Sequence, residues 1–333
     1  MNGKQSLLPP IIPGAAFVGN IQQPQQHYTG KKQKKNNSSS TIVMALIQSG
    51  SNARFLCLSK DRLVKVPPKV APDRAVCLAE TYLSAFQAIH LGAQTRPSIR
   101  YRSKALEGKS ILILEGYSSL GKALIEVAVA SGADRCYALA DPHQHLHIAR
   151  LGAIPLSYNS QHWWTQNNTI TQQQIDVIVA VKDNRGLYTD RVTQGHLNTL
   201  KNDGRVIVIG QPGVDNCFPF SLFPSTGSHS SDDAATTNLM CQTRLHHHAT
   251  TTTTPSRKKA KAHSYNVFDS QEDNPRQATR DLEHLLGLLE REKLSPEILD
   301  LVSLEKVATV QSILESKRVT GHIVCTPWAA NSS

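Results

Sequence analysis

The stretch ILILEGYSSLGKAL, Ile111 to Leu124, places a short apolar run directly before a glycine-containing turn and a helical pattern. In a doubly wound α/β sheet, this kind of strand–turn–helix junction is where a phosphate group binds at the start of the helix. Gly116 suits the tight turn, and Gly121 allows the helix to pack closely on the strand. The small side chains of Ser118 and Ser119 can donate hydroxyl hydrogen bonds. The candidate phosphate-binding residues are therefore Gly116, Ser118, Ser119, Leu120 and Gly121.

Apolar strands and helical stretches continue to alternate on both sides of this junction. Strands are predicted at residues 110–114, 135–140, 153–156, 176–181 and 205–209. Helices are predicted at residues 72–93, 120–131, 144–151 and 189–200. Because the strands are apolar throughout, both of their faces must be covered. The sequence therefore predicts an α/β domain with a doubly wound, Rossmann-type parallel sheet.

Asp141 is the second feature that points to a dinucleotide. It lies 20 residues after Gly121, at the end of the second predicted strand. An acidic side chain there accepts a hydrogen bond from the adenosine ribose and repels a 2′-phosphate, which favours NAD over NADP. The alternative is an ordinary loop aspartate before Pro142, and both interpretations stay open.

Composition excludes several other classes of protein. The 333 residues carry a formal charge of +10, which falls to +2 without the basic runs at 31–35 and 257–261. We therefore do not expect nucleic acid as a partner, and RNA binding through those two runs is a minor alternative. No apolar run approaches the ~20 residues of a membrane-spanning helix. The six cysteines are scattered without a CxxC pair, so neither a zinc knuckle nor a disulfide framework is predicted.

Beyond these features, several segments resemble the zinc-independent medium-chain dehydrogenases/reductases, of the quinone oxidoreductase and enoyl reductase type. The segments are 8–21, 60–90, 110–133, 147–158, 200–210 and 282–327. Together they cover roughly three quarters of the chain. The resemblance implies a partial, mainly β GroES-like catalytic domain at 1–75, which contains a low-complexity tract at 22–40. It further implies a Rossmann domain at 76–222 and C-terminal helices and strands at 266–333 that complete both domains. A low-complexity insertion at 223–265, poor in apolar residues, is predicted to be disordered.

The resemblance also assigns roles to individual residues. Ser84 corresponds to the position beside the nicotinamide and is the candidate catalytic residue. Tyr158 and Asp141 would approach the adenosine ribose. The residues expected to flank the nicotinamide ribose are Gly210, Gln211 and Gly213. Each also has an ordinary explanation: a helix serine, a surface tyrosine and turn glycines.

Three departures from the family pattern carry weight. Glu115 puts a negative charge in the turn, where it would repel a pyrophosphate. The opening strands of the family's catalytic domain are missing, so the resemblance is to an N-terminally truncated member. No set of Cys, His and Glu residues matches the family's catalytic zinc site, and no metal site is expected.

The resemblance therefore implies an NAD(P)H-dependent oxidoreductase with NADP or NAD as its cofactor. Its substrate would be a small quinone or α,β-unsaturated carbonyl, reduced by hydride transfer without zinc. The alternative is a catalytically silent reductase-fold scaffold or binding protein with a degenerate cofactor site. Family members often form homodimers, and we expect no membrane partner and a cytoplasmic location.

Overall fold

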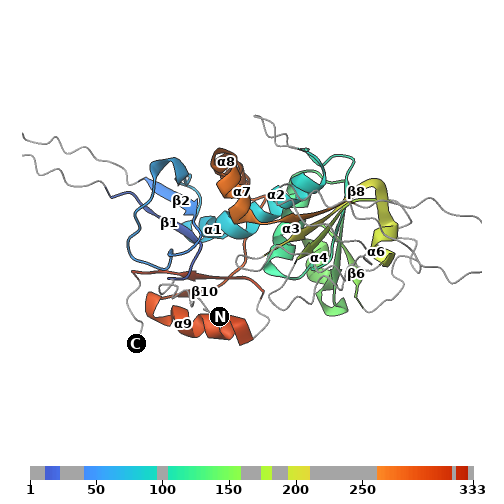
Figure 1. Ribbon diagram of the computed structural model, residues 1–333. Helices are drawn as coiled ribbons and strands as arrows, with labels where there is room; N and C mark the ends of the chain where they lie inside the picture. Colours follow the sequence, from blue (N-terminus) through green and yellow to red (C-terminus); the bar gives the residue numbers. More distant parts are fainter. Residues whose placement is uncertain are drawn as a thin grey trace, which may run out of the picture. The chain divides into compact units, whose positions relative to one another are not determined.

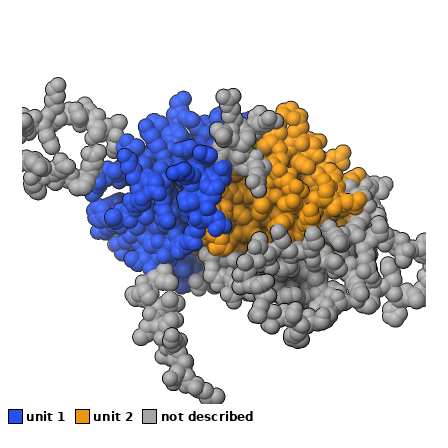
Figure 2. Space-filling view, turned by 45° about the horizontal axis from the view of Figure 1, so that its top comes forward, with its two compact units in different colours: residues 1–83, 271–333 blue, residues 84–270 orange. Residues whose placement is uncertain are grey.

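The computed structural model describes residues 12–22, 41–95, 104–158, 174–181, 194–210, 261–316 and 320–328 (Figure 1). The chain divides into two compact units. Unit 1 comprises residues 1–83 and 271–333, and unit 2 comprises residues 84–270 (Figure 2). Unit 2 is thus inserted into unit 1 along the chain. The predicted division at residues 75/76 and the first passage between the units, at 83/84, fall within one helical stretch that spans residues 72–92.

Unit 2 contains a six-stranded parallel sheet. Its strands are β4 (Ser110–Ile113), β5 (Arg135–Ala140), β6 (Ile154–Ser157), β7 (Ile175–Val181), β8 (Leu200–Ile209) and β9 (Lys261–Tyr265). Its helices are α2 (Leu83–Gly92), α3 (Ser119–Ala130), the 3-10 helix η3 (Pro142–Gln144), α4 (His145–Arg150) and α6 (Gln194–Thr199). The strand order is β6-β5-β4-β7-β8-β9, with every neighbouring pair parallel. The predicted Rossmann-type sheet is confirmed, because this is the order of dinucleotide-binding folds.

Both faces of the sheet are apolar and both carry helices. One face presents a buried cluster that includes Leu112, Tyr137 and Ile178, and Leu197 of α6 packs against it. On the other face, α2 comes so close that a Cβ on Gly92 would lie 2.5 Å from Val177 and 2.9 Å from Ile207. The near-continuous apolar strands predicted this two-sided burial.

Strand β9 corrects the sequence prediction. Its residues, Lys261–Tyr265, fall in the tract at 223–265 that was predicted to be disordered, yet they pair with β8 from Arg205 to Ile209. Tyr265 is the only large apolar side chain in KAHSY, so composition gave little reason to expect a strand. Backbone hydrogen bonds to β8 stabilise this strand, although its side chains have little strand propensity. The rest of that tract, residues 223–260, lies outside the described residues.

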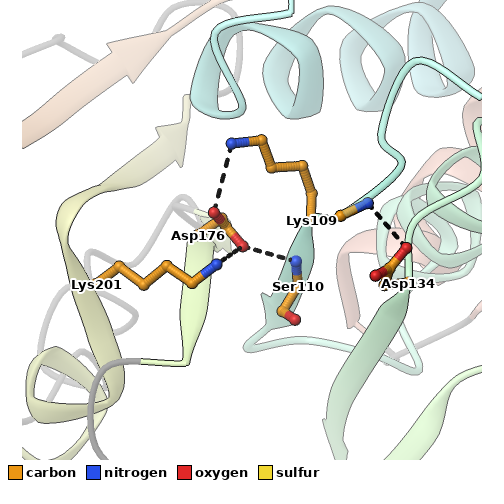
Figure 3. Close-up of polar contacts among 6 residues, drawn as sticks. Lys109, Ser110, Asp134, Asp176 and Lys201 are labelled. Carbon is orange, nitrogen blue, oxygen red and sulfur yellow. Dashed lines mark hydrogen bonds and ion pairs between the residues drawn. The ribbon is translucent and has the colours of Figure 1, made fainter.

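At the amino ends of its strands, the sheet is held by a cluster of charges centred on Asp176 (Figure 3). Asp176, which is 8% exposed, accepts hydrogen bonds from the Ser110 backbone N–H (2.9 Å) and from Lys201 Nζ (2.7 Å). Lys109 Nζ lies 3.4 Å from its other carboxylate oxygen. One carboxylate therefore ties β4, β7 and β8 together.

The two chain ends of unit 2 meet at one side chain. Gln87, on α2, accepts hydrogen bonds at Oε1 from the Tyr265 hydroxyl (2.7 Å) and the Ser270 hydroxyl (2.9 Å). Ser270 is the last residue of unit 2, and Gln87 lies three positions after its first residue, Ser84. The amide thus joins the beginning and the end of the unit.

Unit 1 has a three-stranded antiparallel sheet and a two-stranded parallel sheet. Its strands are β1 (Ala16–Asn20), β2 (Ile42–Leu46), β3 (Val64–Lys65), β10 (Ile298–Val302) and β11 (His322–Cys325). Its helices are η1 (Lys60–Arg62), α1 (Pro72–Cys77), the π-helical turn η2 (Leu78–Tyr82), α8 (Pro275–Glu290), η6 (Leu304–Lys306) and α9 (Val307–Ser316). Helix α7 (Val267–Asp273) contains the second passage between the units.

Segments that are far apart in the sequence contact one another within unit 1. Gln271 donates a hydrogen bond to the Leu46 carbonyl (3.1 Å), and Gln48 is hydrogen-bonded to Glu272. The rings of Phe55 and Trp328 meet edge to face, with 5.2 Å between centroids. These contacts join the N-terminal and C-terminal segments of unit 1, whose small antiparallel sheet agrees with the predicted mainly β part.

Candidate dinucleotide-binding site

The candidate site lies where the strand order of unit 2 reverses. The chain runs from β4 outward through β5 to β6, and then returns to β7 on the other side of β4. In such sheets, ligands bind at the carboxyl ends of the strands beside this reversal. The turn after β4 is fixed to both neighbours, because Leu114 N–H donates to the Val179 carbonyl (3.0 Å) and Gly116 N–H donates to the Leu139 carbonyl (2.9 Å).

Gly116 and Gly121 are required by close approaches. A Cβ on Gly116 would lie 2.8 Å from the Ala138 Cβ and 3.0 Å from the Leu139 carbonyl oxygen. A Cβ on Gly121 would overlap the Glu115 carbonyl oxygen, which is a backbone atom and cannot swing aside. The glycines thus allow the turn to press against β5, and helix α3 to begin directly on the turn.

Ser118 is the N-cap of α3. Its backbone is extended, and its hydroxyl accepts the Gly121 N–H at 2.9 Å. The same hydroxyl donates to the Glu115 carbonyl at 3.0 Å. The hydroxyl proton of Ser118 is therefore used inside the turn, so this residue shapes the site and its hydroxyl does not serve as the expected phosphate donor.

The N-terminus of α3 is the candidate anion-binding element. The first-turn N–H groups of a helix have no carbonyl acceptor within that helix, and the helix dipole places partial positive charge there. Ser119 and Leu120 are the first two residues of α3. The backbone at these two positions is what a pyrophosphate would meet.

A cluster of aromatic and cationic side chains borders the turn. The sequence analysis did not predict this cluster. Lys122 Nζ lies 4.4 Å from the centre of the Tyr117 ring, and the His147 ring meets Tyr117 edge-on at 5.7 Å. Lys122 is only 7% exposed. The position of Lys122 directly after Gly121 was the one feature of the sequence that could have indicated this cluster. The bulk of Tyr117 is thus held by α3 and α4.

The two predicted ribose residues follow the neighbouring strands. Asp141 comes directly after β5 and precedes η3, and its backbone N–H donates to Gln144 Oε1 at 3.2 Å. Tyr158 comes directly after β6, and its hydroxyl donates to the Leu114 carbonyl at 2.9 Å. Tyr158 is therefore tied to the end of β4, beside the turn. The structure brings both residues to the same edge of the sheet as Gly116 and Gly121.

The predicted nicotinamide residues are less well placed by the structure. Ser84 is buried near the start of α2, and no contact described in the structure joins it to the turn after β4. Gly210 directly follows β8, and its N–H donates to the Tyr265 carbonyl at 2.8 Å. Gln211 and Gly213 lie outside the described residues. The roles of these residues stay predictions.

Other chemistry finds little support within the described ranges. No group of three or more His, Cys, Asp or Glu residues there is arranged to hold a metal ion. Burial raises the pKa of the Cys77 and Cys136 thiols to about 12, so neither is a thiolate nucleophile near neutral pH. None of the helices described is both long and apolar enough to cross a membrane.

The backbone geometry of the turn suits a dinucleotide, but the charge of one of its side chains does not. The glycine-dependent close approach and the capped helix N-terminus match what a pyrophosphate requires. Glu115 is half-buried in the turn, and its negative charge would repel a pyrophosphate. The residues that would hold the cofactor are those of the turn, with Asp141 beside the ribose.

Solved structures show which fold this is, although no protein-family model and no curated protein matches the sequence. The human synaptic vesicle membrane protein VAT-1 homolog-like protein is 14% identical, with a TM-score of 0.62 over 96% of this chain and 81% of that chain. The quinone oxidoreductase from Coxiella burnetii is 17% identical, with a TM-score of 0.59 over 94% of this chain and 78% of that chain. CurK enoyl reductase is 15% identical, with a TM-score of 0.63 over 95% and 79% of the respective chains. The chain therefore has the fold of the medium-chain dehydrogenases/reductases, with its Rossmann-type and GroES-like parts.

Proposed function

We propose that this chain binds NAD(P)H and reduces a quinone or an α,β-unsaturated carbonyl by hydride transfer without zinc. The observation that carries the proposal is the glycine-dependent, Ser118-capped turn at the strand-order reversal of unit 2. Structural neighbours described as a quinone oxidoreductase and an enoyl reductase support the substrate class. We expect the protein to act in the cytoplasm on a small molecule, as a homodimer.

The roles of the chain's own residues follow from the site. The backbone at Ser119 and Leu120 binds the pyrophosphate, and Gly121 allows α3 to begin directly on the turn. Asp141 orients the adenosine ribose and favours NADH, whereas the family norm is NADPH. When bound, the reduced nicotinamide supplies the hydride. Ser84 and the glycine after β8 would position the nicotinamide end.

A fluorescence titration of the full chain with NADH and NADPH tests the proposal. We expect micromolar binding, and we expect Gly121→Asp to abolish it because the new side chain would collide with the Glu115 carbonyl. Gly19→Asp is the matched control, since a Cβ at Gly19 meets nothing within 4 Å. Circular dichroism confirms that each variant is folded. Unchanged binding in Gly121→Asp would refute the assignment of the turn.

The second candidate function, a silent scaffold, is favoured by Glu115 in the turn and by the internal use of the Ser118 hydroxyl proton. It predicts no binding of either cofactor up to about 1 mM, a ceiling of only ~4 kcal/mol. The same titration therefore separates the two functions. Turnover of a quinone by the bound cofactor would exclude the scaffold.

A further inference from the structure

Three basic side chains share one face of the last two strands of the unit 2 sheet. Arg205 of β8 pairs with Lys261 of β9, and two positions further along, Ile207 pairs with His263. The side chains of paired residues in adjacent strands point to the same face, and alternate residues of one strand share a face. Arg205, Lys261 and His263 therefore form one group, which we call the edge cluster because β9 is the last strand of the sheet.

The edge cluster lies on the face of the sheet that α2 covers. A Cβ on Gly92 of α2 would lie 2.9 Å from the side chain of Ile207, which shares this face. Val206 and Val208 point to the opposite face and belong to the buried apolar cluster there. Strand β7 separates β8 from β4, so the edge cluster is not part of the candidate dinucleotide-binding turn.

The basic side chains of the edge cluster have no counter-charge within the described part of the chain. The structure describes no hydrogen bond or ion pair there for the side chains of Arg205, Lys261 and His263. Lys261 is exposed and the other two residues are half-buried, but Arg205 Nε and His263 Nε2 are buried without a hydrogen-bond partner. Buried polar groups of native proteins are nearly always hydrogen-bonded, so these two nitrogen atoms call for an explanation.

The two cations are close enough to act on the imidazole. Burial lowers the pKa of His263, and the positive charges of Arg205 and Lys261 lower it further. The other titratable or charged side chains on the elements around this face make no described contact with the edge cluster. They are His90 of α2, Lys201 and Asp203 of β8, and Tyr265 of β9. An anion within the edge cluster would offset the repulsion that the two cations exert on protonated His263.

We propose that Arg205, Lys261 and His263 bind a tetrahedral oxyanion, such as a phosphate or sulfate group, at the edge of the unit 2 sheet. The planar guanidinium of Arg205 suits two oxygens of such a group, and the ammonium of Lys261 adds a point charge. Protonated His263 donates to another oxygen from Nε2. Because β8 and β9 both supply ligands, the anion ties β9 to the sheet. The edge cluster binds this anion whether or not the chain reduces a substrate.

The C-terminus of α2 offers a different explanation for Arg205. Helix α2 ends at Gly92, which lies against Ile207, and the negative end of a helix dipole attracts a cation. This role would stabilise the fold without an anion. It leaves Nε2 of His263 without a partner, whereas an oxyanion satisfies both buried nitrogen atoms. The experiment must therefore follow the response of His263 to an anion as well as the stability of the protein.

The test is NMR of the full chain labelled in its histidine rings, with the His263 signal assigned by His263→Gln. Sulfate is the probe, because its charge is constant over the pH range in which histidine titrates. We expect sulfate to raise the pKa of His263 above its value in chloride of equal ionic strength, since an anion favours the imidazolium. Sulfate should also bind more tightly as pH falls, because the two equilibria are linked. The signal of His284, on α8 in unit 1, should show no change specific to sulfate.

Variants of Arg205 separate its charge from its geometry. Arg205→Met should weaken sulfate binding about tenfold, the effect of losing one charge-assisted hydrogen bond. Arg205→Lys keeps the charge without the planar fork and should lie between Arg205→Met and the wild type. Lys261→Met should have a smaller effect, because Lys261 is exposed. Arg150→Met is the matched control, since Arg150 is an exposed arginine on α4, and it should bind sulfate like the wild type. Circular dichroism checks that each variant is folded.

Two further anions identify the source of the oxyanion. Inorganic phosphate and adenosine 5′-monophosphate are each titrated at one pH, with the His263 signal as the readout. If phosphate acts at the lower concentration, the ligand is the free anion. If adenosine 5′-monophosphate acts at the lower concentration, the edge cluster takes a phosphate ester. Either result supports the site.

Three results would overturn the site. The first is a pKa of His263 that is the same in sulfate and in chloride. The second is sulfate binding that stays as tight as in the wild type in both Arg205→Met and Lys261→Met, since sulfate then acts elsewhere. The third is a loss of stability in Arg205→Met while sulfate has no effect on His263 in the wild type, which would make the end of α2 the partner of Arg205. None of these results depends on whether NADH or NADPH binds.

Discussion

The two ends of the sheet in unit 2 differ in how their charged side chains are paired. At the amino ends, the Asp176 carboxylate is buried and balanced by Lys109 and Lys201 (Figure 3). At the carboxyl ends, the turn after β4 presents a helix N-terminus and the half-buried Glu115, and the half-buried Asp141 follows β5. The amino end satisfies its charges within the protein, whereas the carboxyl end holds the proposed cofactor site. Stability and binding should therefore respond to mutation at different ends of the same strands.

The largest effect is expected for Asp176→Ala, which should affect stability alone. The variant removes a buried carboxylate that accepts a backbone N–H and two lysines. Breaking a buried ion pair typically costs 3–5 kcal/mol. The lysine side chains are 32% and 35% exposed and become hydrated, so we expect a loss of about 3 kcal/mol, at the low end of that range.

Urea unfolding measures this loss, and a cofactor titration of the folded variant provides the contrast. The dissociation constant should stay within about twofold of the wild-type value. The control is Asp203→Ala, because Asp203 is exposed at the same end of the sheet. A large change in cofactor affinity in Asp176→Ala would show that the two ends are coupled.

The next largest effect is expected for Glu115→Gln, which should tighten cofactor binding. Two like charges ~5 Å apart at an effective dielectric constant of ~20 repel by about 3 kcal/mol. Glu115 is half-exposed, so we expect about half of this, or roughly tenfold in the dissociation constant. The gain should shrink at high salt.

Titration at two salt concentrations checks this prediction, with Glu107→Gln as the control from the opposite end of the sheet. An unchanged dissociation constant in Glu115→Gln would mean that the carboxylate points away from the bound cofactor. The comparison between the two ends would then rest on Asp141 alone.

The smallest effect is expected for Ser118→Ala, which should slightly lower both the stability of the protein and its affinity for the cofactor. Loss of an N-cap hydroxyl costs about 1 kcal/mol, and the variant loses the hydrogen bonds to Gly121 and Glu115. Cofactor affinity should fall a few-fold as the first turn of α3 loosens. Ser118→Thr should restore both, as measured by urea unfolding and titration. A stability unchanged in Ser118→Ala would contradict the capping role.

Local patterns were enough to predict most of the sheet. The five predicted strands correspond to β4, β5, β6, β7 and β8, because each contains a short apolar run. The helix predicted at residues 72–93 is found as α1, η2 and α2, and its π turn has no signature in residue type. Strand β9 was missed because its pairing with β8 depends on tertiary contact rather than on its own composition.

The candidate site was predictable only where its residues are close in sequence. Gly116, Ser118 and Gly121 form one turn, so a single motif revealed them. The contact between the Tyr117 and His147 rings beside the turn joins residues 30 positions apart, and no local pattern could have linked them. The internal use of the Ser118 hydroxyl is a matter of geometry that residue type does not determine.

The hydrogen bonds of Gln87 have a consequence for the modularity of the chain. Because one amide near the start of unit 2 binds Ser270, its last residue, the unit leaves unit 1 and returns to it at neighbouring points. Segments with adjacent ends are those that tolerate domain insertion and circular permutation. Residues 84–270 therefore form a cassette that two crossovers could exchange for a related one. Such an exchange would leave the rest of the chain, residues 1–83 and 271–333, unchanged.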